Sequence, residues 1–310
     1  MQTARNQPGH LHLLRLKDGS PWLHMCIRHA ETAAYLMDEA ELDDLIVDAL
    51  LEEDTRSRVR LRDDGIMVLL KAMHLKGEEM AKPEDMVSIR LWLTPGNVIT
   101  TREADVDPVI EIASRLIAGE GPETPGAFLA DLVEEHLREI AEQAEMLEDA
   151  TDEIARLINL HQSEQACPNM ADTETRISGF LRHLNPQRPV LETLSTHPHP
   201  VIGDRERAQL DDALNRLLRF LETLQNLRER IAILNDQVER IQDRHLSRSS
   251  YVFAAVATIF LPLGFVSGMF GVNLPGIPLE TMASGFWALF AICVGLVAVV
   301  IGLLRWNKML

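Results

Sequence analysis

The sequence predicts an α/β cytosolic domain, followed by a long α-helical stalk and two transmembrane helices. Three observations lead to this prediction. In the first third of the chain, short apolar runs are separated by turn residues, which is typical of paired strands. In the middle, apolar residues recur at helical spacing. Beyond about Arg248 the chain is almost uncharged, and it contains two apolar runs long enough to cross a membrane.

The overall charge excludes one large class of function. Of the 310 residues, 47 are Asp or Glu and 30 are Lys or Arg, which gives a formal net charge of −17. A general nucleic-acid binder needs a basic face to displace phosphate counterions, so we expect no nucleic-acid partner. The three cysteines are too scattered for a disulfide framework or a Cys-rich zinc module. The first twenty residues contain no continuous apolar run, so we expect no secretory signal peptide.

Residues 1–120 are expected to form an α/β/α domain on the cytosolic side of the membrane. Helical periodicity predicts one helix over Tyr35–Glu53 and another over Asp107–Ala118. The apolar face of the first helix is formed by Leu42, Leu45, Ile46, Ala49 and Leu50. Because paired strands lie between these helices in the sequence, we expect a mainly antiparallel or mixed sheet.

Two hairpins are predicted from their turn residues. The turns are Asp63-Asp64-Gly65 and Thr94-Pro95-Gly96. Asp, Pro and Gly supply the backbone conformations that tight turns require. The predicted strands on either side of these turns are residues 58–62, 66–75, 86–93 and 97–102.

Residues 121–250 are expected to be cytosolic and helical. Pro125 suits the first turn of a helix that reaches about Gln165. A shorter helical segment from Met170 to about Ser195 ends in the turn-rich sequence THPHPVIGD. The first of these helices carries ten acidic residues and one basic residue between positions 131 and 153. This stretch is interpreted either as a solvated face or as a field that concentrates cations near the cytosolic mouth.

The stalk helix, over about 204–250, is predicted to begin near Asp204, a suitable N-cap residue. Its apolar residues recur at steps of three and four, as they do in a coiled coil. They are Leu210, Leu214, Leu217, Leu221, Leu224, Leu227, Ile231, Leu234, Val238 and Ile241. No strong helix breaker separates this repeat from the first apolar run. One helix is therefore expected to enter the membrane, either as a purely structural stalk or as a rod on which the cytosolic domain pulls.

Two transmembrane helices are predicted, over residues 251–270 and 286–304. About 20 apolar residues in a helix span the hydrocarbon core of a lipid bilayer, and a helix satisfies its own backbone polar groups there. The segment between them, 271–285, contains no basic residue. Two buried helices of a soluble core are the alternative, but adjacent runs of this length argue against it.

Basic residues set the expected orientation. Arg244 and Arg248 precede the first span, and Arg305 and Lys308 follow the second. By the positive-inside rule both termini, including the tail 305–310, are cytosolic, and the loop is periplasmic. We therefore expect a two-span protein of the bacterial inner or plasma membrane.

Directly after the first span the chain reads Gly271-Val272-Asn273, followed by LPGIP. With the preceding ATIFLPLGFVSGMF and the two-span ending, this segment resembles the CorA superfamily of divalent-cation transporters. Those proteins carry Gly-Met-Asn at this place, so Val272 departs from their pattern. Gly-Val-Asn followed by Gly-Ile-Pro is similar to the ZntB branch, which is associated with zinc. The resemblance implies a homopentameric funnel whose central pore is lined by the first transmembrane helix of each subunit.

The residues also suit a pore when the resemblance is set aside. One subunit with two spans cannot enclose a water-filled path, so transport requires oligomerisation. Around an axis, Asn273 would form a ring of amide oxygens that accept hydrogen bonds from the water shell of a hydrated cation. Gly268 and Gly271 would let the backbone turn or approach closely there. Asn273 is alternatively a helix C-cap, and the two interpretations are compatible.

Counting back from Asn273 by three or four residues gives a mostly apolar stripe with a few hydroxyls, which includes Leu261, Thr258 and Ser250. No acidic residue or His lies within the span, so tight chelation of dehydrated zinc is not expected. Leu261 and Phe253 are candidate constrictions, although either could equally face lipid.

Ionisable residues near the ends of the span are candidates for attracting cations. Five copies of Glu280 would attract cations to the outer entrance. Asp236 and Asp243 on the stalk face either the axis or solvent. Because the span itself has no acid or His, proton coupling would involve Glu280 or His245.

Two histidine pairs have spacings that suit zinc on a loop. They are His197 with His199, and His10 with His12. No third ligand lies nearby in the sequence, so ordinary surface histidines are the alternative.

These features favour divalent-metal transport over two other classes of function. Zinc is the expected ion, magnesium, cobalt, nickel and cadmium are alternatives, and no resident cofactor is expected. A membrane-anchored sensor or scaffold would need no Asn ring. We find no P-loop, Gly-rich phosphate cradle or catalytic triad, so we expect no enzyme. Energy for transport would then come from ion gradients or the membrane potential.

Overall fold

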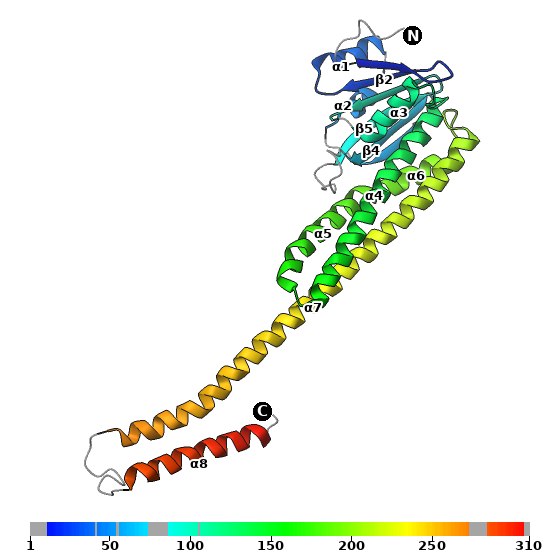
Figure 1. Cartoon of the computed structure of the whole chain (residues 1–310). Coiled ribbons are helices and arrows are strands. Elements are labelled where there is room, and N and C mark those ends of the chain that lie inside the picture. Colours follow the sequence, from blue (N-terminus) through cyan, green and yellow to red (C-terminus); the bar gives the residue numbers. More distant parts are fainter. Residues whose placement is uncertain are drawn as a thin grey trace. The chain divides into compact units, whose positions relative to one another are not determined.

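The structure is a computed structural model that describes residues 11–40, 42–53, 56–73, 86–104, 106–272 and 284–306. The chain forms two compact units, Met1–Asn235 and Asp236–Leu310. The first unit contains a sheet with helices on both faces and a group of long helices. The second contains the apolar end of one long helix and a separate apolar helix (Figure 1).

A six-stranded mixed sheet, in the order β1-β2-β6-β5-β4-β3, is the centre of the N-terminal domain. Its strands are β1 (Leu11–Arg15), β2 (Pro21–Cys26), β3 (Arg58–Arg62), β4 (Gly65–Met73), β5 (Met86–Thr94) and β6 (Asn97–Arg102). Strands β2 and β6 pair in parallel, and each other neighbouring pair among the described strands is antiparallel. The predicted mixed sheet is therefore confirmed.

Both predicted hairpins are present, because their turn residues fix the register. Arg62 pairs with Gly65 across β3 and β4, which leaves Asp63 and Asp64 as the two loop residues. Thr94 pairs with Asn97 across β5 and β6 in the same way. The predicted end of the second strand at residue 75 lies outside the described residues.

Strands β1 and β2 were not predicted. In β2, Trp22, Leu23 and Met25 are buried together with His24, so consecutive side chains are covered on both faces of the sheet. A strand that is buried on both faces does not show the alternation of apolar and polar residues that identifies a half-buried strand. The sequence pattern therefore did not reveal it.

The single helix predicted over 35–53 is wrong, because the structure divides this region. It contains α1 (Ala30–Ala34), the π-helix η1 (Tyr35–Glu39) and α2 (Asp44–Leu51). The Asp43 side chain accepts a hydrogen bond from the backbone N–H of Leu45 at 2.8 Å, so Asp43 caps a new helix. Leu45, which was predicted on the apolar face, is exposed, whereas Ile46 and Leu50 are buried.

Helices cover both faces of the sheet and form the predicted α/β/α layers. On one face, η1 and α2 pack on strand residues in one apolar cluster that includes Leu50, Met67 and Trp92. On the other face, Phe128 from α4 contacts Trp22 from β2, with ring centroids 4.7 Å apart. Helix α3 (Asp107–Ile117) also packs on this side, near β1, and confirms the predicted second helix.

The long helices of the first unit are α4 (Pro125–Asn159), α5 (Ser163–Leu184) and α6 (Gln187–Thr196). Helix α4 ends before the predicted Gln165, because the chain reverses at His161, which has a positive φ of 61°. The segment predicted from Met170 to about Ser195 is in fact α5 and α6. They are separated at Pro186, where a proline disfavours continuation of the preceding helix.

Helix α7 (Asp204–Phe270) begins at the predicted residue and continues through the first predicted span. Most of its apolar repeat is buried within this one chain, where α7 lies beside α4. Ion pairs Arg216–Glu134 and Arg230–Asp152 join the two helices at 2.9 and 2.6 Å. The repeat is therefore a core inside one chain rather than a free seam for self-association, although Leu214 and Ile241 are only half-buried.

Candidate pore helix and its cytosolic support

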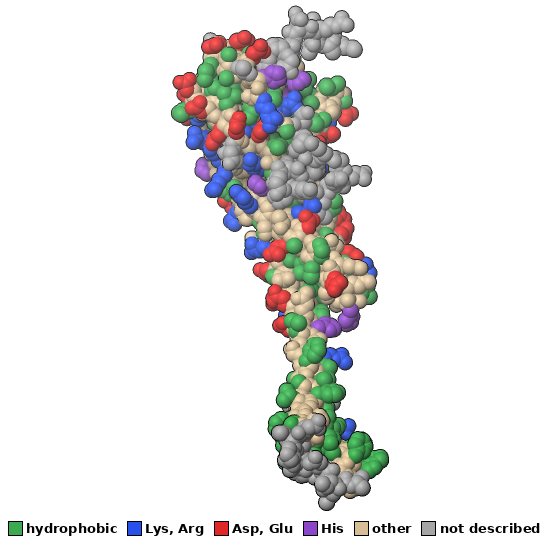
Figure 2. Space-filling model, turned by 90° about the vertical axis from the view of Figure 1, so that its left-hand side faces the viewer, with side chains coloured by type: hydrophobic (Ala, Val, Ile, Leu, Met, Phe, Trp, Pro, Cys, Tyr) green, Lys and Arg blue, Asp and Glu red, His purple; other side chains and the backbone are tan. Residues whose placement is uncertain are grey.

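The two predicted spans are helices with almost no burial inside the chain. They are the apolar part of α7 and helix α8 (Gly285–Trp306). Phe253 and Leu261, the candidate constrictions, are 75% and 73% exposed. Figure 2 shows hydrophobic side chains around these helices, whereas charged side chains are interspersed with hydrophobic ones on the visible face of the first unit. Such a surface needs lipid or further protein to cover it.

The predicted pore residues of α7 share one face of the helix. At about 100° per residue, Ser250, Leu261 and Gly268 point in nearly the same direction, because seven and eleven residues complete about two and three turns. Thr258 and Phe253 lie on either side of this line, within an arc of about 140°. The stripe is thus geometrically consistent as one side of a pore.

Hydroxyl groups on this helix bond to its own backbone. Thr258 Oγ1 donates to the carbonyl of Ala254 at 2.7 Å, and Ser267 Oγ donates to that of Gly264 at 3.2 Å. Pro262 lies inside the helix and has no N–H to donate to the carbonyl of Thr258. The Thr258 hydroxyl oxygen and this carbonyl are therefore left as acceptors for water.

The motif after the first span lies only partly within the described residues. The N–H of Gly271 donates to Ser267 O and Gly268 O, which closes the last turn of α7. A Cβ at Gly271 would lie 3.2 Å from Ser267 O, whereas a Cβ at Gly268 would meet open space. Val272 is exposed. Asn273 and Glu280 lie outside the described residues.

Asp243 precedes Ser250 by seven residues, and Asp236 precedes Asp243 by the same interval. The two aspartates therefore lie on the helix face that continues into the predicted pore stripe. His245 instead follows the buried Val238 by seven residues, so it lies on the opposite side of α7. Asp236 lies 3.9 Å from Arg240 in a weak ion pair. This geometry separates the two aspartates from His245, which the sequence had grouped together.

The His197–His199 pair is held by backbone groups. The N–H of Val201 donates to Nδ1 of His199, so the ring proton is on Nε2, which lies 2.8 Å from the carbonyl of Arg62. His197 Nδ1 lies 3.2 Å from the carbonyl of Thr193. His199 therefore joins the loop before α7 to the β3–β4 turn. His10 lies outside the described residues.

No group of three or more His, Cys, Asp or Glu side chains within the described residues is arranged to hold a metal ion. A hydrated ion that contacts polar groups weakly leaves a pore faster than a chelated ion does.

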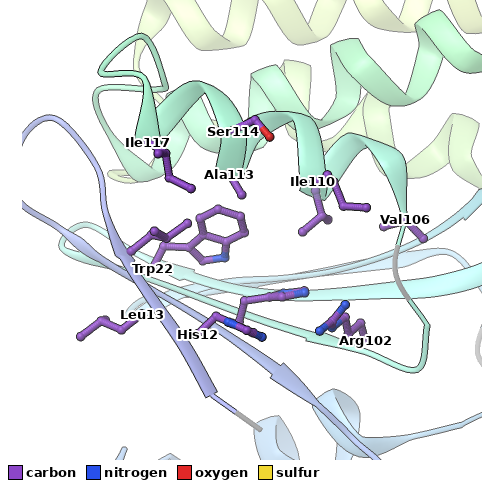
Figure 3. Close-up of a pocket in the computed structure, with 12 residues that line it drawn as sticks. His12, Leu13, Trp22, Arg102, Val106, Ile110, Ala113, Ser114 and Ile117 are labelled. Atoms are coloured by element: carbon purple, nitrogen blue, oxygen red, sulfur yellow. The ribbon is translucent and has the colours of Figure 1, made fainter. Parts of the chain in front are cut away.

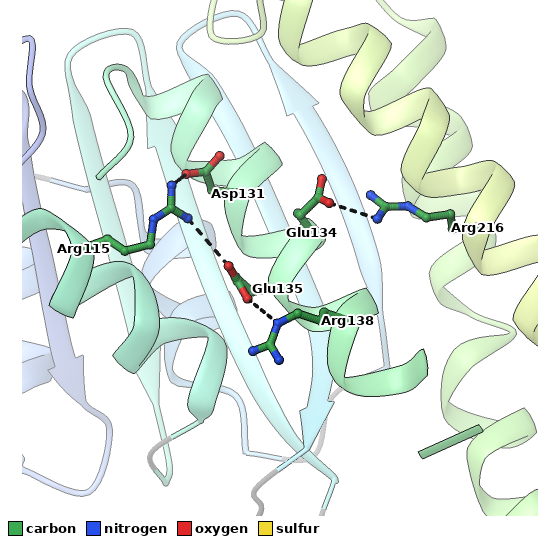
Figure 4. Close-up of polar contacts among 6 residues, drawn as sticks. All are labelled: Arg115, Asp131, Glu134, Glu135, Arg138 and Arg216. Atoms are coloured by element: carbon green, nitrogen blue, oxygen red, sulfur yellow. Dashed lines mark hydrogen bonds and ion pairs between the residues drawn. The ribbon is translucent and has the colours of Figure 1, made fainter. Parts of the chain in front are cut away.

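Several acidic side chains of α4 form ion pairs with neighbouring helices (Figure 4). Arg115 on α3 contacts Asp131 at 3.0 Å and Glu135 at 3.7 Å. Glu135 also contacts Arg138, and Glu134 contacts Arg216 on α7. Burial raises the pKa of Asp131, and Arg115 opposes this effect. At this end of α4 the acidic side chains therefore join helices, rather than forming only a solvated face.

Two buried ionisable residues on α4 were missed by the sequence analysis. His136 is 2% exposed, and burial lowers its pKa to about 4. Glu139 is 3% exposed, and burial together with the charge of Asp107 raises its pKa to about 8. A signal existed, because His136 lies three residues after the buried Val133 and four before Ile140, so it continues the apolar track.

Comparison with known proteins identifies the family. Residues 17–306 match the family described as CorA-like Mg2+ transporter protein. The chain belongs to this family. The CorA-like family is one of metal-ion transporters, not enzymes, and this member is an integral membrane protein with two spans.

Curated members of the family are similar over most of the chain. The zinc transport protein ZntB of Yersinia enterocolitica is 32% identical, and the match covers 93% of this chain and 86% of that protein. The divalent cation transporter CmaX of Pseudomonas aeruginosa is also 32% identical, with coverage of 92% and 86%.

Solved structures share the fold. The full-length CmaX structure superposes with a TM-score of 0.82 at 28% identity, covering 99% of this chain and 93% of that one. The CorA magnesium transporter of Methanocaldococcus jannaschii has a TM-score of 0.78 at 18% identity, covering 92% and 90%. These likenesses confirm the predicted architecture of cytosolic α/β domain, long helix and two membrane helices.

Proposed function

We propose that this CorA-family chain transports divalent metal cations across the bacterial inner membrane, with zinc as its main substrate. Its functional form is a homopentamer in which α7 of each subunit lines a central pore. The similarity to proteins named for zinc transport supports zinc. Gly-Val-Asn in place of Gly-Met-Asn, at residues 271–273, supports the same choice.

The uncovered face of α7 is the observation that carries this proposal. Asp236 and Asp243 lie in line with Ser250, Leu261 and Gly268, and these residues are exposed in the single chain, as is most of the rest of the span. A single chain with two spans cannot enclose a path alone, so five copies of this face around an axis would form one. The aspartates would then attract cations at the cytosolic end, and the hydroxyls would contact the hydration shell.

Asn273 completes the pore in this proposal. A ring of amide oxygens at the periplasmic end would accept hydrogen bonds from the water around a cation without holding the ion by charge. Five Glu280 side chains beside it would raise the local cation concentration. Both termini would lie in the cytosol, because basic residues flank the spans on that side.

Zinc uptake by the reconstituted protein tests this proposal. The chain is purified, its mass is measured, and it is reconstituted into liposomes that contain a zinc-sensitive dye. Wild type is expected to be a pentamer that admits zinc faster than magnesium. Asn273→Ala is expected to abolish uptake while the pentamer remains, whereas Asn169→Ala on the exposed surface of α5 is expected to behave as wild type.

Each part of the proposal has its own contrary result. A monomeric or dimeric mass would contradict the pentamer. Unchanged zinc uptake by a correctly assembled Asn273→Ala protein would contradict the amide ring. Magnesium uptake faster than zinc uptake would favour the CorA-like alternative of magnesium, cobalt or nickel transport. No uptake above that of empty liposomes would favour a sensor or scaffold.

A further inference from the structure

A pocket of about 320 Å³ lies between α3 and the strand pair β1–β2 in the cytosolic domain. Figure 3 shows its arrangement. Ala113 and Ile117 from α3 face Trp22 across it. Its volume falls within the range of sites that bind small molecules. None of the predicted pore residues within the described part of the chain lines it.

The floor of the pocket is fixed by hydrogen bonds. Trp22 Nε1 donates to Thr100 Oγ1 at 2.8 Å, and Nδ1 of His24 lies 2.6 Å from the same oxygen. Trp22 also packs on Phe128 from α4, so its ring is held from behind. A pocket with such a floor is formed before any ligand arrives, which reduces the entropy cost of binding.

The roof of the pocket exposes apolar surface. Ile110 and Ile117 lie seven residues apart on one face of α3, with Ala113 between them. Ile117 is 77% exposed and Ile110 is 48% exposed, although other apolar residues of α3, such as Val109 and Ile112, are buried. This apolar surface beside the pocket would gain from covering by an alkyl or aryl group.

One end of the pocket is basic. Arg102 and His12 lie beneath the N-terminal half of α3, near Val106 and Ile110 (Figure 3). His24 also lines the pocket, and its ring lies 6.5 Å from that of His12. Among the residues that the structure describes, none that lines the pocket is Asp or Glu, although the whole chain has a net charge of −17. The N-terminal end of a helix adds positive potential there.

Arg102 contributes positive charge at this end, whereas His24 does not. Burial and the charges of Arg102 and His12 lower the pKa of His24 to about 3, so His24 is neutral at physiological pH. An arginine keeps its charge and presents a planar group that matches a carboxylate with two parallel hydrogen bonds.

We propose that this pocket binds a small amphipathic carboxylate. Its carboxylate contacts Arg102 at the basic end, and its alkyl or aryl part lies along Ala113, Ile117 and Trp22. Charge complementarity selects this ligand class over an amine, and the apolar walls select it over a hydrophilic anion such as citrate. The proposal does not depend on which metal the protein transports.

Three ligands with one tail and different head groups test the proposal. Radiolabelled decanoate, decanol and decyltrimethylammonium are dialysed to equilibrium against the full-length protein in zwitterionic lipid nanodiscs. Binding to empty nanodiscs is subtracted, because all three partition into lipid. Decanoate is expected to bind at least about tenfold more tightly than decanol, since a charged hydrogen-bonded pair contributes about 1.5–3 kcal/mol. The ammonium compound is expected to bind most weakly.

Variants locate the binding to this pocket. Arg102→Gln is expected to weaken decanoate binding about tenfold and to change decanol binding less than about twofold. Arg102→Lys is expected to retain part of the preference for decanoate. Ala113→Phe fills the apolar part and is expected to weaken both ligands. Arg60→Gln, on exposed β3 away from the pocket, is the matched control and is expected to behave as wild type.

The contrary results are equally specific. Equal binding of decanoate and decanol, or decanoate binding that Arg102→Gln does not change, would overturn the proposal. Absence of decanoate binding to the assembled wild type would also overturn it. Thermal unfolding of each variant shows whether a loss of binding reflects a loss of folding, and Arg102→Lys and Ala113→Phe give independent readouts.

Discussion

The ring Nε2 of His136 on α4 lies 2.9 Å from the side-chain oxygen Oε1 of Gln187 on α6. An amide oxygen can only accept, so Nε2 carries the proton and donates it. The amide nitrogen of Gln187 then donates to the backbone carbonyl of Lys71 on β4 at 2.8 Å. One chain of hydrogen bonds therefore joins α4, α6 and the sheet. His136 is neutral in this chain of hydrogen bonds, because burial penalises a second proton on the ring.

His136 makes the fold sensitive to acid. Its pKa falls from 6.5 to about 4 in the folded chain, so between these pH values the unfolded state binds a proton that the folded state does not. The stability that this residue contributes is complete above pH 6.5 and is lost as pH falls through 4. His136→Gln is expected to flatten the fall in melting temperature between pH 6.5 and 4.

Thermal unfolding of the full chain in detergent measures this effect. The expected change is a few degrees, because 1 kcal/mol moves the melting temperature by about 2–4 °C in a domain of this size. The part of the acid response that comes from buried His24 is expected to remain. The exposed His197→Gln is the matched control. An acid response identical in His136→Gln and wild type would contradict the prediction.

Glu139 has the opposite dependence on pH. Burial raises its pKa from 4.5 to about 8, so the unfolded state releases a proton at a lower pH than the folded state. The stability associated with its protonated form is complete below pH 4.5 and is lost as pH rises through 8. Glu139→Gln is expected to become more stable relative to wild type as pH rises over this range. Glu142→Gln, at an exposed site on the same helix, should show no such trend.

The sequence predicts those features of the fold that depend on neighbouring residues, and it misses those that depend on contacts between distant ones. Turn chemistry at Asp63-Asp64-Gly65 and Pro95-Gly96 is local, so both hairpins and their registers could be predicted. The break before α2 depends on Asp43 acting as an N-cap. The local sequence does not show whether this residue lies inside a helix or at its start. Strand β2 is buried on both faces, and only its neighbours in the fold make it a strand.

The candidate site divides in the same way. The helical period alone places Ser250 and Leu261 on one face, so the sequence predicted this part of the stripe, whereas Gly268 was predicted for its backbone and lies on the same face. The sequence analysis named both Asp243 and His245 as candidates, but it did not place them on opposite sides of the helix. That distinction needs a known buried side, which Val238 provides, and Val238 is buried by tertiary packing. The apolar repeat of α7 was recognised as a seam, but only the structure shows which part of the same chain covers it.

The packing of α7 leads to a prediction about stability. Leu217 is fully buried in the repeat, so Leu217→Ala is expected to destabilise the first unit by about 2–5 kcal/mol. The neighbouring Arg216 forms a partly exposed ion pair with Glu134, so Arg216→Gln is expected to cost about 1 kcal/mol or less. Denaturant unfolding followed by circular dichroism compares the two variants. Equal losses would contradict a core inside the chain.

The helix face of α7 leads to a prediction about transport. Asp243 lies on the face that continues into Ser250, and His245 lies on the opposite side. Asp243→Asn is expected to lower initial zinc uptake into liposomes several-fold at low ionic strength, because a ring of five charges near the mouth would be lost. His245→Gln is expected to leave uptake unchanged at equal neutral pH on both sides. High salt should reduce the difference between Asp243→Asn and wild type. Equal effects of the two variants would show that the assigned face is wrong.

A pH gradient tests how transport is energised. No Asp, Glu or His lies between Ser249 and Asn273, so we expect no proton relay of ionisable side chains through the first span. Any coupling must then act through groups outside the span, where a change in protonation alters the local charge and the affinity for cations. Glu280 at the outer loop and His245 on the stalk are the groups that we expect to respond. Zinc uptake should depend on the pH gradient, and Glu280→Gln or His245→Ala should weaken that dependence.

The measurement compares initial zinc uptake at equal pH with uptake under gradients of either sign. Liposomes in which an ionophore carries zinc correct for effects of pH on the dye and on free zinc. Because His245 lies off the pore face, His245→Ala is expected to change only the response to the gradient, whereas Asp243→Asn lowers uptake under every condition. If zinc entry is the same across the physiological pH range with and without a gradient, the protein is a passive channel, and the membrane potential and the zinc gradient alone drive the ion.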